Sequence, residues 1–314
     1  MRPKYKKRAN EIKENLSSFH QENYRLPGIQ HPKTKHTLTR QLIDSEKRVE
    51  YVRKLLERDL SERRADPNDS AMFDPIKGAI VKKRNGALDE AFWLVFYSVH
   101  FGEHREGGWC YAREVYNRCG EQGVWDWETT KKNLEEFRPW LAAHKTVIEE
   151  ERCESGGFGK HRSYQSLSAH TRNNASTGAA FETYVNWISP PRSHSELMEQ
   201  AEEQANGEPE EAFDLLYNSM DEVASFGRLA KFDYLTMIGK LDLADIRPGS
   251  AYMEGSTGPM KGVEFLLGDQ ADELKTETID RLLVNLGEQL GVGMQVIEDA
   301  LCNWQKNPWK YKKF

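Results

Sequence analysis

Apolar residues recur at helical spacing along most of the chain, whereas the strict alternation typical of strands is almost absent. From Leu38 to about Arg64, apolar positions fall near one helical face and Arg and Lys occupy the other. The stretch Leu88–His104, LDEAFWLVFYSVHFGEH, is apolar on nearly all sides, which is typical of a central helix. We expect Asp89 to cap this helix and Gly102 to end it. The pattern predicts a mostly α protein.

Further amphipathic helices are predicted from about Cys110 to Cys119, over residues 125–141, through Phe181–Trp187 and between Ser195 and Glu222. Residues 276–305 predict a helical hairpin with LGVG at its corner. The breaker ADPNDS at residues 65–70 ends the first long helix. We therefore expect a basic N-terminal helical arm over residues 1–70 and one helical domain over residues 71–314.

Charge is distributed unevenly along the 314 residues, although the net charge is only −6. Residues 1–64 hold seventeen Lys and Arg against nine Asp and Glu, whereas residues 193–227 hold ten acidic residues and no Lys or Arg. A local basic face is what phosphate binding needs, so the arm is compatible with DNA; a solvated helix is the alternative. The tail NPWKYKKF at residues 307–314 combines aromatic rings with lysines, and either DNA contact or disorder is expected there.

The cysteines Cys110, Cys119, Cys153 and Cys302 are scattered, with no CxxC pair. We interpret them as reduced thiols of a cytoplasmic protein and expect neither metal nor cofactor. No apolar run is long enough to span a bilayer, so no membrane partner is expected.

Several familiar catalytic motifs are missing from the sequence. It contains no GxxxxGK[ST], GxGxxG, HExxH or GxSxG, which disfavours kinases, Rossmann enzymes, metalloproteases and standard hydrolases. His100 and His104 are four residues apart, but Gly102 lies between them and a third ligand is not evident. Hydrogen bonding at a helix end is favoured there over a metal site.

Three glycine-rich segments suit contact with an anion or a nucleic-acid backbone, because glycine lets a backbone approach a ligand closely. In Ser155–Leu167, glycines precede basic side chains and an aromatic ring; Ser225–Gly262 includes a Gly-Pro helix entry; and LGVG forms the corner of the hairpin. The expected DNA-contacting residues are Gly157, Gly159, Lys160, His161, Arg162, Tyr164, Gly227, Arg228, Ser256, Thr257, Gly258, Lys261, Gly291 and Gly293. The alternatives are a basic surface loop in the first segment and ordinary helix corners in the other two.

Carboxylates near these turns are the candidate catalytic groups, namely Asp245, Glu254 and Asp233. Beside a bound nucleic acid, a carboxylate can stabilise a developing sugar cation or activate a water molecule.

Four segments carry a family resemblance: LDEAFWLVFYSVHFGEH, GFGKHRSYQSL, SFGRLAKFDYLTMIGKL and IRPGSAYMEGSTGPMKG. Together they resemble the alpha-glutamyl/putrescinyl thymine pyrophosphorylase family from about Phe73 onward, most specifically between Phe226 and Gly262. The resemblance implies DNA hypermodification and a helical fold like that of helix-hairpin-helix DNA glycosylases. It also implies that His100, His104 and Tyr252 form a base-flipping wedge or pocket.

The resemblance supports two enzymatic hypotheses and leaves a third class open. The first is a monomeric DNA glycosylase of anti-phage defence, which excises a modified base such as glucosylated hydroxymethylcytosine from duplex DNA and leaves an abasic site. The second is a transferase that replaces pyrophosphate on hydroxymethyluracil in DNA with an amine or amino acid, using the GGFGKHR loop for pyrophosphate. The third is a DNA-binding module without chemistry.

Overall fold

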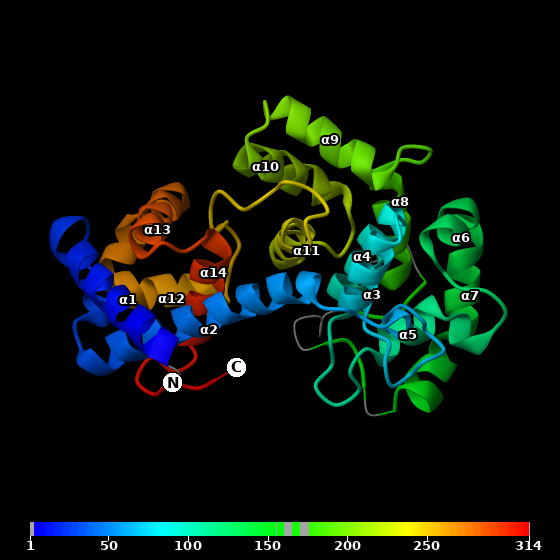
Figure 1. The fold of residues 1–314 in the computed structure, drawn as a ribbon, viewed down its shortest axis with the longest axis horizontal. Coiled ribbons are helices and arrows are strands. Elements are labelled where there is room, and N and C mark those ends of the chain that lie inside the picture. The colour runs from blue at the N-terminus through cyan, green and yellow to red at the C-terminus, as the bar shows by residue number, and fades with distance from the viewer. Residues whose placement is uncertain (1–2, 155, 160–164, 170–175, 314) are drawn as a thin grey trace. The chain divides into compact units, whose positions relative to one another are not determined.

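The computed structural model describes residues 3–154, 156–159, 165–169 and 176–313. In these ranges the chain forms fourteen α-helices, with isolated bridges but no strand, so the prediction of a mostly α protein is confirmed (Figure 1). None of the described helices is long and apolar enough to cross a membrane. The resemblance to helix-hairpin-helix glycosylases stays a prediction.

Two compact units divide the chain: Met1–Arg53 with Pro248–Phe314 form the first, and Lys54–Arg247 form the second. The predicted boundary at residue 70 falls inside the second unit. The first unit contains α1 (Pro3–Glu22), most of α2 (Pro32–Glu57), α12 (Gly258–Leu267), α13 (Thr276–Leu290) and α14 (Met294–Trp304). The second contains α3 (Pro75–Arg84), α4 (Leu88–Phe101), α5 (Cys110–Tyr116), α6 (Trp127–Lys132), α7 (Leu134–Thr146), α8 (Thr177–Ile188), α9 (His194–Gln204), α10 (Pro209–Ser219) and α11 (Arg228–Lys240).

In the first unit, α1 packs against α13 through an apolar face and caps the C-terminus of that helix. The buried residues of α1 are Ala9, Ile12, Leu16 and Phe19, which recur at helical spacing. Arg8 Nη2 donates to the carbonyl of Leu290 at 2.7 Å. A helix ends with unpaired carbonyls and a partial negative charge, so a guanidinium stabilises this end of α13.

The predicted helical hairpin is confirmed by α13 and α14. Gly291 ends α13 in the left-handed conformation, with φ of 63°, and Gly293 is the residue before the first turn of α14. The tail also belongs to this unit: the side-chain amide of Gln41 donates to the carbonyl of Lys312 at 2.8 Å, and Tyr311 hydrogen-bonds Asp44. The expectation of a disordered tail is therefore wrong, because residues 308–313 lie along α2.

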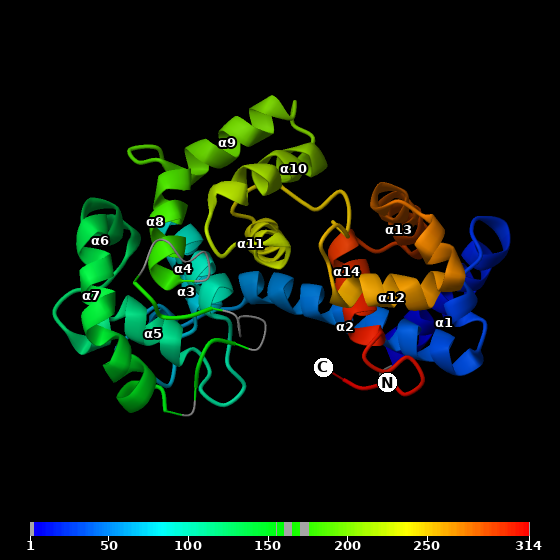
Figure 2. The ribbon, with the colours of Figure 1, turned by 180° about the vertical axis from the view of Figure 1, so that it is seen from behind.

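In the second unit, α4 is the central helix, and all eleven residues from Ala91 to Phe101 are buried. α3 lies along it, and α9 and α11 also contact it; Figure 2 shows the same helices from behind. Gly102 follows α4 with φ of 67°, so the predicted helix end is confirmed. The expectation that Asp89 caps α4 is wrong, because its Oδ1 accepts instead from the backbone N–H of His194 at 2.8 Å.

The packing of α12 against α14 leaves no room for a side chain at Gly262. A Cβ built there would lie 2.5 Å from the carbonyl oxygen of Leu301, far inside van der Waals contact. At Gly293, in the same unit, a Cβ would meet no atom of the described residues within 4 Å.

We expect Gly262→Ala to lower the free energy of unfolding by about 1 to 3 kcal/mol, because the clash outweighs the helix propensity that alanine adds. Gly293→Ala is the matched control and should change it by less than about 0.5 kcal/mol. Urea denaturation of both variants measures the difference. Equal effects of the two substitutions would contradict the close packing of α12 and α14.

Candidate functional site

The glycine-rich loop predicted to contact DNA is attached to the connection between α4 and α5. The N–H of Gly159 donates to the carbonyl of Phe101 at 2.7 Å, and a Cβ on Gly159 would lie 2.9 Å from the carbonyl carbon of Gly102. Farther along the connection, a Cβ on Gly107 would lie 2.7 Å from Cα of Gly156. Glycine is therefore required at these contacts, and the structure brings together two segments that sequence analysis had singled out.

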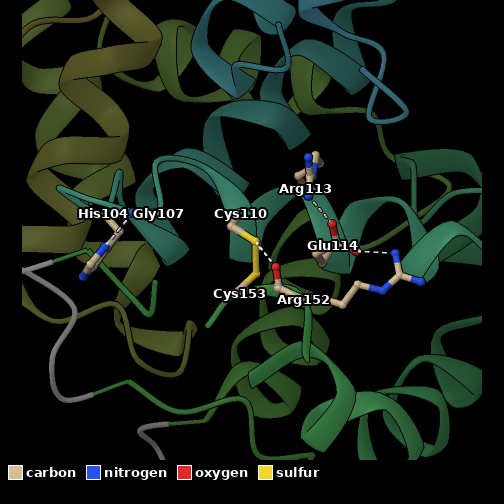
Figure 3. The surroundings of a disulfide bond; sticks show 7 residues. All are labelled: His104, Gly107, Cys110, Arg113, Glu114, Arg152 and Cys153. Atoms are coloured by element: carbon tan, nitrogen blue, oxygen red, sulfur yellow. Dashed lines mark hydrogen bonds and ion pairs between the residues drawn. A yellow bond between two sulfur atoms is a disulfide. The ribbon is translucent and has the colours of Figure 1, made fainter. Parts of the chain in front are cut away.

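The connection itself is a fixed turn. His104 and Gly108 exchange two backbone hydrogen bonds of 2.9 Å, and Nδ1 of His104 accepts from the N–H groups of Glu106 and Gly107, at 3.2 Å and 3.0 Å. Figure 3 shows the imidazole beside Gly107. His104, which was predicted to contribute to a wedge or pocket, thus holds the turn by hydrogen bonds.

A disulfide joins Cys110, the first residue of α5, to Cys153, which follows the helical turn Val147–Arg152 (Figure 3). The Cα atoms are 5.8 Å apart, within the range that a disulfide spans. The expectation of four reduced thiols is wrong for this pair, whereas Cys119 and Cys302 form no disulfide within the described residues. Spacing gave no sign of the bond, because the cysteines are 43 residues apart and the intervening helices bring them together.

Next to the disulfide, one buried carboxylate lies between two guanidinium groups. Glu114, with 3% of its side chain exposed, pairs through one oxygen with Arg113 and through the other with Nη1 of Arg152 at 3.4 Å (Figure 3). Since two positive charges face one negative charge, the cluster keeps a net positive charge.

A cavity of about 430 Å³ opens beside this turn, and we call it the Arg64 pocket. Its walls come from the residues before α3, from α3, from the α4–α5 connection and from α5. The residues that line it are Arg64, Ser70, Ala71, Phe73, Asp74, Lys77, Glu103, Glu106, Gly107, Gly108, Trp109, Cys110 and Arg113.

Two of the cations that line the Arg64 pocket form ion pairs within the protein. Lys77 pairs with Asp74, whose carboxylate also accepts the backbone N–H of Lys77 at 3.0 Å and so caps α3. Arg113 pairs with Glu114.

The remaining charged groups of the Arg64 pocket have no ionic partner among the residues that the structure describes. Arg64 donates to the carbonyl of Met72 at 2.9 Å but pairs with no carboxylate there. Glu103 and Glu106 are exposed and take part in no ion pair within the same residues. One guanidinium and two carboxylates are therefore available to a ligand.

The other predicted site residues lie elsewhere, and their roles stay predictions. In the second unit, Asp233 is on α11, Gly227 and Arg228 stand at its start, and the exposed Asp245 follows it. In the first unit are Tyr252, Glu254, Ser256, Thr257, Gly258, Lys261, Gly291 and Gly293. Lys160, His161, Arg162 and Tyr164 lie outside the described residues, and Gly157 is inside them, where an added Cβ would meet no described atom within 4 Å.

His100 is only 1% exposed, and its Nε2 lies 3.0 Å from the hydroxyl of Thr177. The ring contacts Phe96, Phe101 and Phe181, so it is part of the aromatic core around α4.

Sequence analysis missed a chain of buried polar groups in this core. Nδ1 of His194 lies 2.7 Å from Asp89, Nε2 lies 2.9 Å from the hydroxyl of Tyr184, and that hydroxyl lies 2.7 Å from the hydroxyl of Tyr234. Burial lowers the pKa of His194, although Asp89 opposes the shift, so the neutral ring is favoured. The members come from α4, α8, α9 and α11 and fix these helices to one another.

Glu90, the neighbour of Asp89, is the second titratable group of this core. Burial raises its pKa to about 7, although its carboxylate accepts from the hydroxyl of Tyr116 at 2.6 Å and from the N–H of Trp127 at 2.8 Å. The folded protein therefore holds a proton on Glu90 at pH values where the unfolded chain has lost it.

Because of Glu90, raising the pH from about 4.5 to 7 should lower the free energy of unfolding by up to about 3 kcal/mol. Glu90→Gln should lack this contribution, since its amide does not titrate and can serve both partners. Denaturation of the two proteins at pH 5 and pH 8 measures the difference. The exposed Glu203→Gln is the control and should keep the wild-type pH dependence; an unchanged dependence in Glu90→Gln would argue against the raised pKa.

Reduction of the disulfide should lower the free energy of unfolding by about 2 to 4 kcal/mol, because a loop of 43 residues is then released in the unfolded chain. Thermal unfolding with and without dithiothreitol shows this effect, and Cys110→Ser should abolish the response. Cys302→Ser is the control and should retain it. Titration of four thiols in the denatured, unreduced protein would contradict the bond.

Comparison with known proteins gives a family match over residues 33–314. No curated protein and no solved structure matches the chain. The sequence model of one family does match, and it spans residues 33–314, which include most or all of every helix except α1. The chain therefore belongs to the alpha-glutamyl/putrescinyl thymine pyrophosphorylase family, clade 3.

Proposed function

We propose that the protein is a DNA-modifying transferase that displaces pyrophosphate from an activated hydroxymethyluracil in DNA with an amine or amino acid. The observation that carries the proposal is the family match over residues 33–314. The family description joins a modified thymine to pyrophosphate chemistry and names two groups, glutamyl and putrescinyl, whose parent compounds carry amino groups. This favours the transferase over the glycosylase. No observation on the described residues supports excision of a base.

The reaction is a substitution at the exocyclic CH₂ carbon of the base. The nitrogen lone pair forms the C–N bond while the C–O bond to pyrophosphate breaks, and pyrophosphate leaves with that electron pair. The nitrogen loses a proton to a base. An enzyme accelerates such a step by holding both reactants in line and by stabilising the charge on the leaving group.

The glycine-rich loop is the proposed holder of the pyrophosphate. Its contacts through Gly156 and Gly159 fix its start on the α4–α5 connection, and the sequence continues at once into Lys160, His161 and Arg162. Backbone N–H groups and cations are the usual partners of phosphate oxygens. Asp233, Asp245 and Glu254 remain the candidates for orienting the base or accepting a proton.

The test uses a duplex with one 5-(pyrophosphoryloxymethyl)uracil, incubated with the protein and a mixture of putrescine and amino acids. We expect a heavier nucleoside in the digested DNA and an equal amount of released pyrophosphate. Mass spectrometry and a coupled pyrophosphate assay give the two readouts.

Two controls separate the alternatives. Duplexes with plain thymine or hydroxymethyluracil should give no product, because neither carries the leaving group. Abasic sites in duplexes with hydroxymethylated or glucosylated bases would point to the glycosylase instead. Binding of DNA with neither product would reduce the protein to a binding module.

A further inference from the structure

We propose that the Arg64 pocket binds the nucleophile of the transfer reaction and that this nucleophile is a free amino acid. The inference rests on the proposed transferase function and adds the binding site and the chemical class of the second substrate.

The guanidinium of Arg64, which has no ionic partner among the described residues, can bind an anionic group of the ligand. Its planar fork of donors matches a carboxylate, and among the described residues the one contact that uses that capacity is to the carbonyl of Met72. Lys77 and Arg113, the other cations of the pocket, already have Asp74 and Glu114 as partners.

The carboxylates of Glu103 and Glu106 can bind a cationic group of the ligand. Glu106 belongs to the turn closed by His104 and Gly108, so its backbone position is fixed before a ligand arrives. Glu103 directly precedes this turn, and its carbonyl oxygen would lie 3.1 Å from a Cβ on Gly159. An ammonium group between them would meet two negative charges without a competing ion pair from the described residues. The same carboxylates can accept the proton that the ammonium group must release before its nitrogen attacks.

An amino acid is the ligand class that satisfies both ends of the pocket. A diamine such as putrescine would place a second ammonium group near the guanidinium of Arg64, and the two positive charges would repel each other. Pyrophosphate would face the carboxylates of Glu103 and Glu106, and the negative charges would repel each other. The cavity of about 430 Å³ is of the size that small ligands occupy, and Phe73 and Trp109 supply apolar wall for a side chain.

The position of the pocket suits a nucleophile, because it shares a wall with the glycine-rich loop. Gly107 lines the pocket and touches Gly156, and Cys110 lines it and is bonded to Cys153, two residues before the loop begins. If the loop holds the pyrophosphate, the attacking nitrogen and the leaving group are bound on adjacent surfaces. Substitution requires the reacting atoms to be within about 3.5 Å, so adjacent sites are necessary.

Binding without DNA tests the inference directly. Isothermal titration of the full chain uses glycine, glutamate and lysine as amino-acid probes, with putrescine and inorganic pyrophosphate as comparisons. We expect at least one amino acid to bind, and Arg64→Gln and Glu106→Gln each to weaken it tenfold or more. Arg105→Gln is the matched control, because Arg105 is exposed on the same turn but does not line the pocket; it should change the affinity less than twofold.

Three outcomes would overturn the inference: no amino acid binds, putrescine or pyrophosphate binds in an Arg64-dependent way instead, or Arg105→Gln weakens binding as much as Arg64→Gln. If Arg64→Gln fails to fold, Glu106→Gln on the exposed turn decides in its place. Failure of the proposed function is distinguishable, because Arg64-dependent binding of an amino acid without any DNA product would count against the transfer reaction alone. Transfer that proceeds unchanged in Arg64→Gln and Glu106→Gln would count against the pocket alone.

Discussion

The burial of α4 on every side is the constraint on which the second unit depends. A helix with eleven consecutive buried residues cannot present a functional face, so its chemistry is confined to its two ends. At the N-terminal end, the carboxylates of Asp89 and Glu90 accept hydrogen bonds from α9, α5 and the start of α6. At the C-terminal end, the carbonyl of Phe101 accepts from Gly159 and holds the glycine-rich loop. The core and the candidate site are thus connected through one helix.

The candidate site consists of loops, yet its loops are tied down at several points. The disulfide fixes the chain just before the glycine-rich loop, backbone contacts of Gly156 and Gly159 fix the loop, and the His104 imidazole fixes the opposite turn. Such anchoring lowers the conformational entropy that a ligand must remove on binding. It also explains why the carboxylates of Glu103 and Glu106 can stand without an ionic partner among the described residues, since the backbone near them is held by other interactions.

The sequence allowed the fold class and several helix ends to be predicted, because these depend on local periodicity and on glycine at positive φ. Gly102 and Gly291 are examples. The errors concern interactions between distant residues: Asp89 bonds a residue 105 positions away, and Cys110 pairs with a residue 43 positions away. The Arg64 pocket could not be predicted for the same reason, because its charges come from separate helices and turns. For the predicted site residues that lie in the described ranges, the structure gives the positions and experiments must give the roles.

The discontinuity of the first unit has a consequence for protein synthesis. The apolar face of α1 is complete early, but its partner α13 follows only after the 194 residues of Lys54–Arg247. At ordinary elongation rates the ribosome needs roughly 10 to 40 s for that stretch. The second unit is continuous and can fold as it emerges, whereas Ile12, Leu16 and Phe19 must wait with their side chains uncovered. The core that buries α1 is therefore completed only when the last helices of the chain have been made.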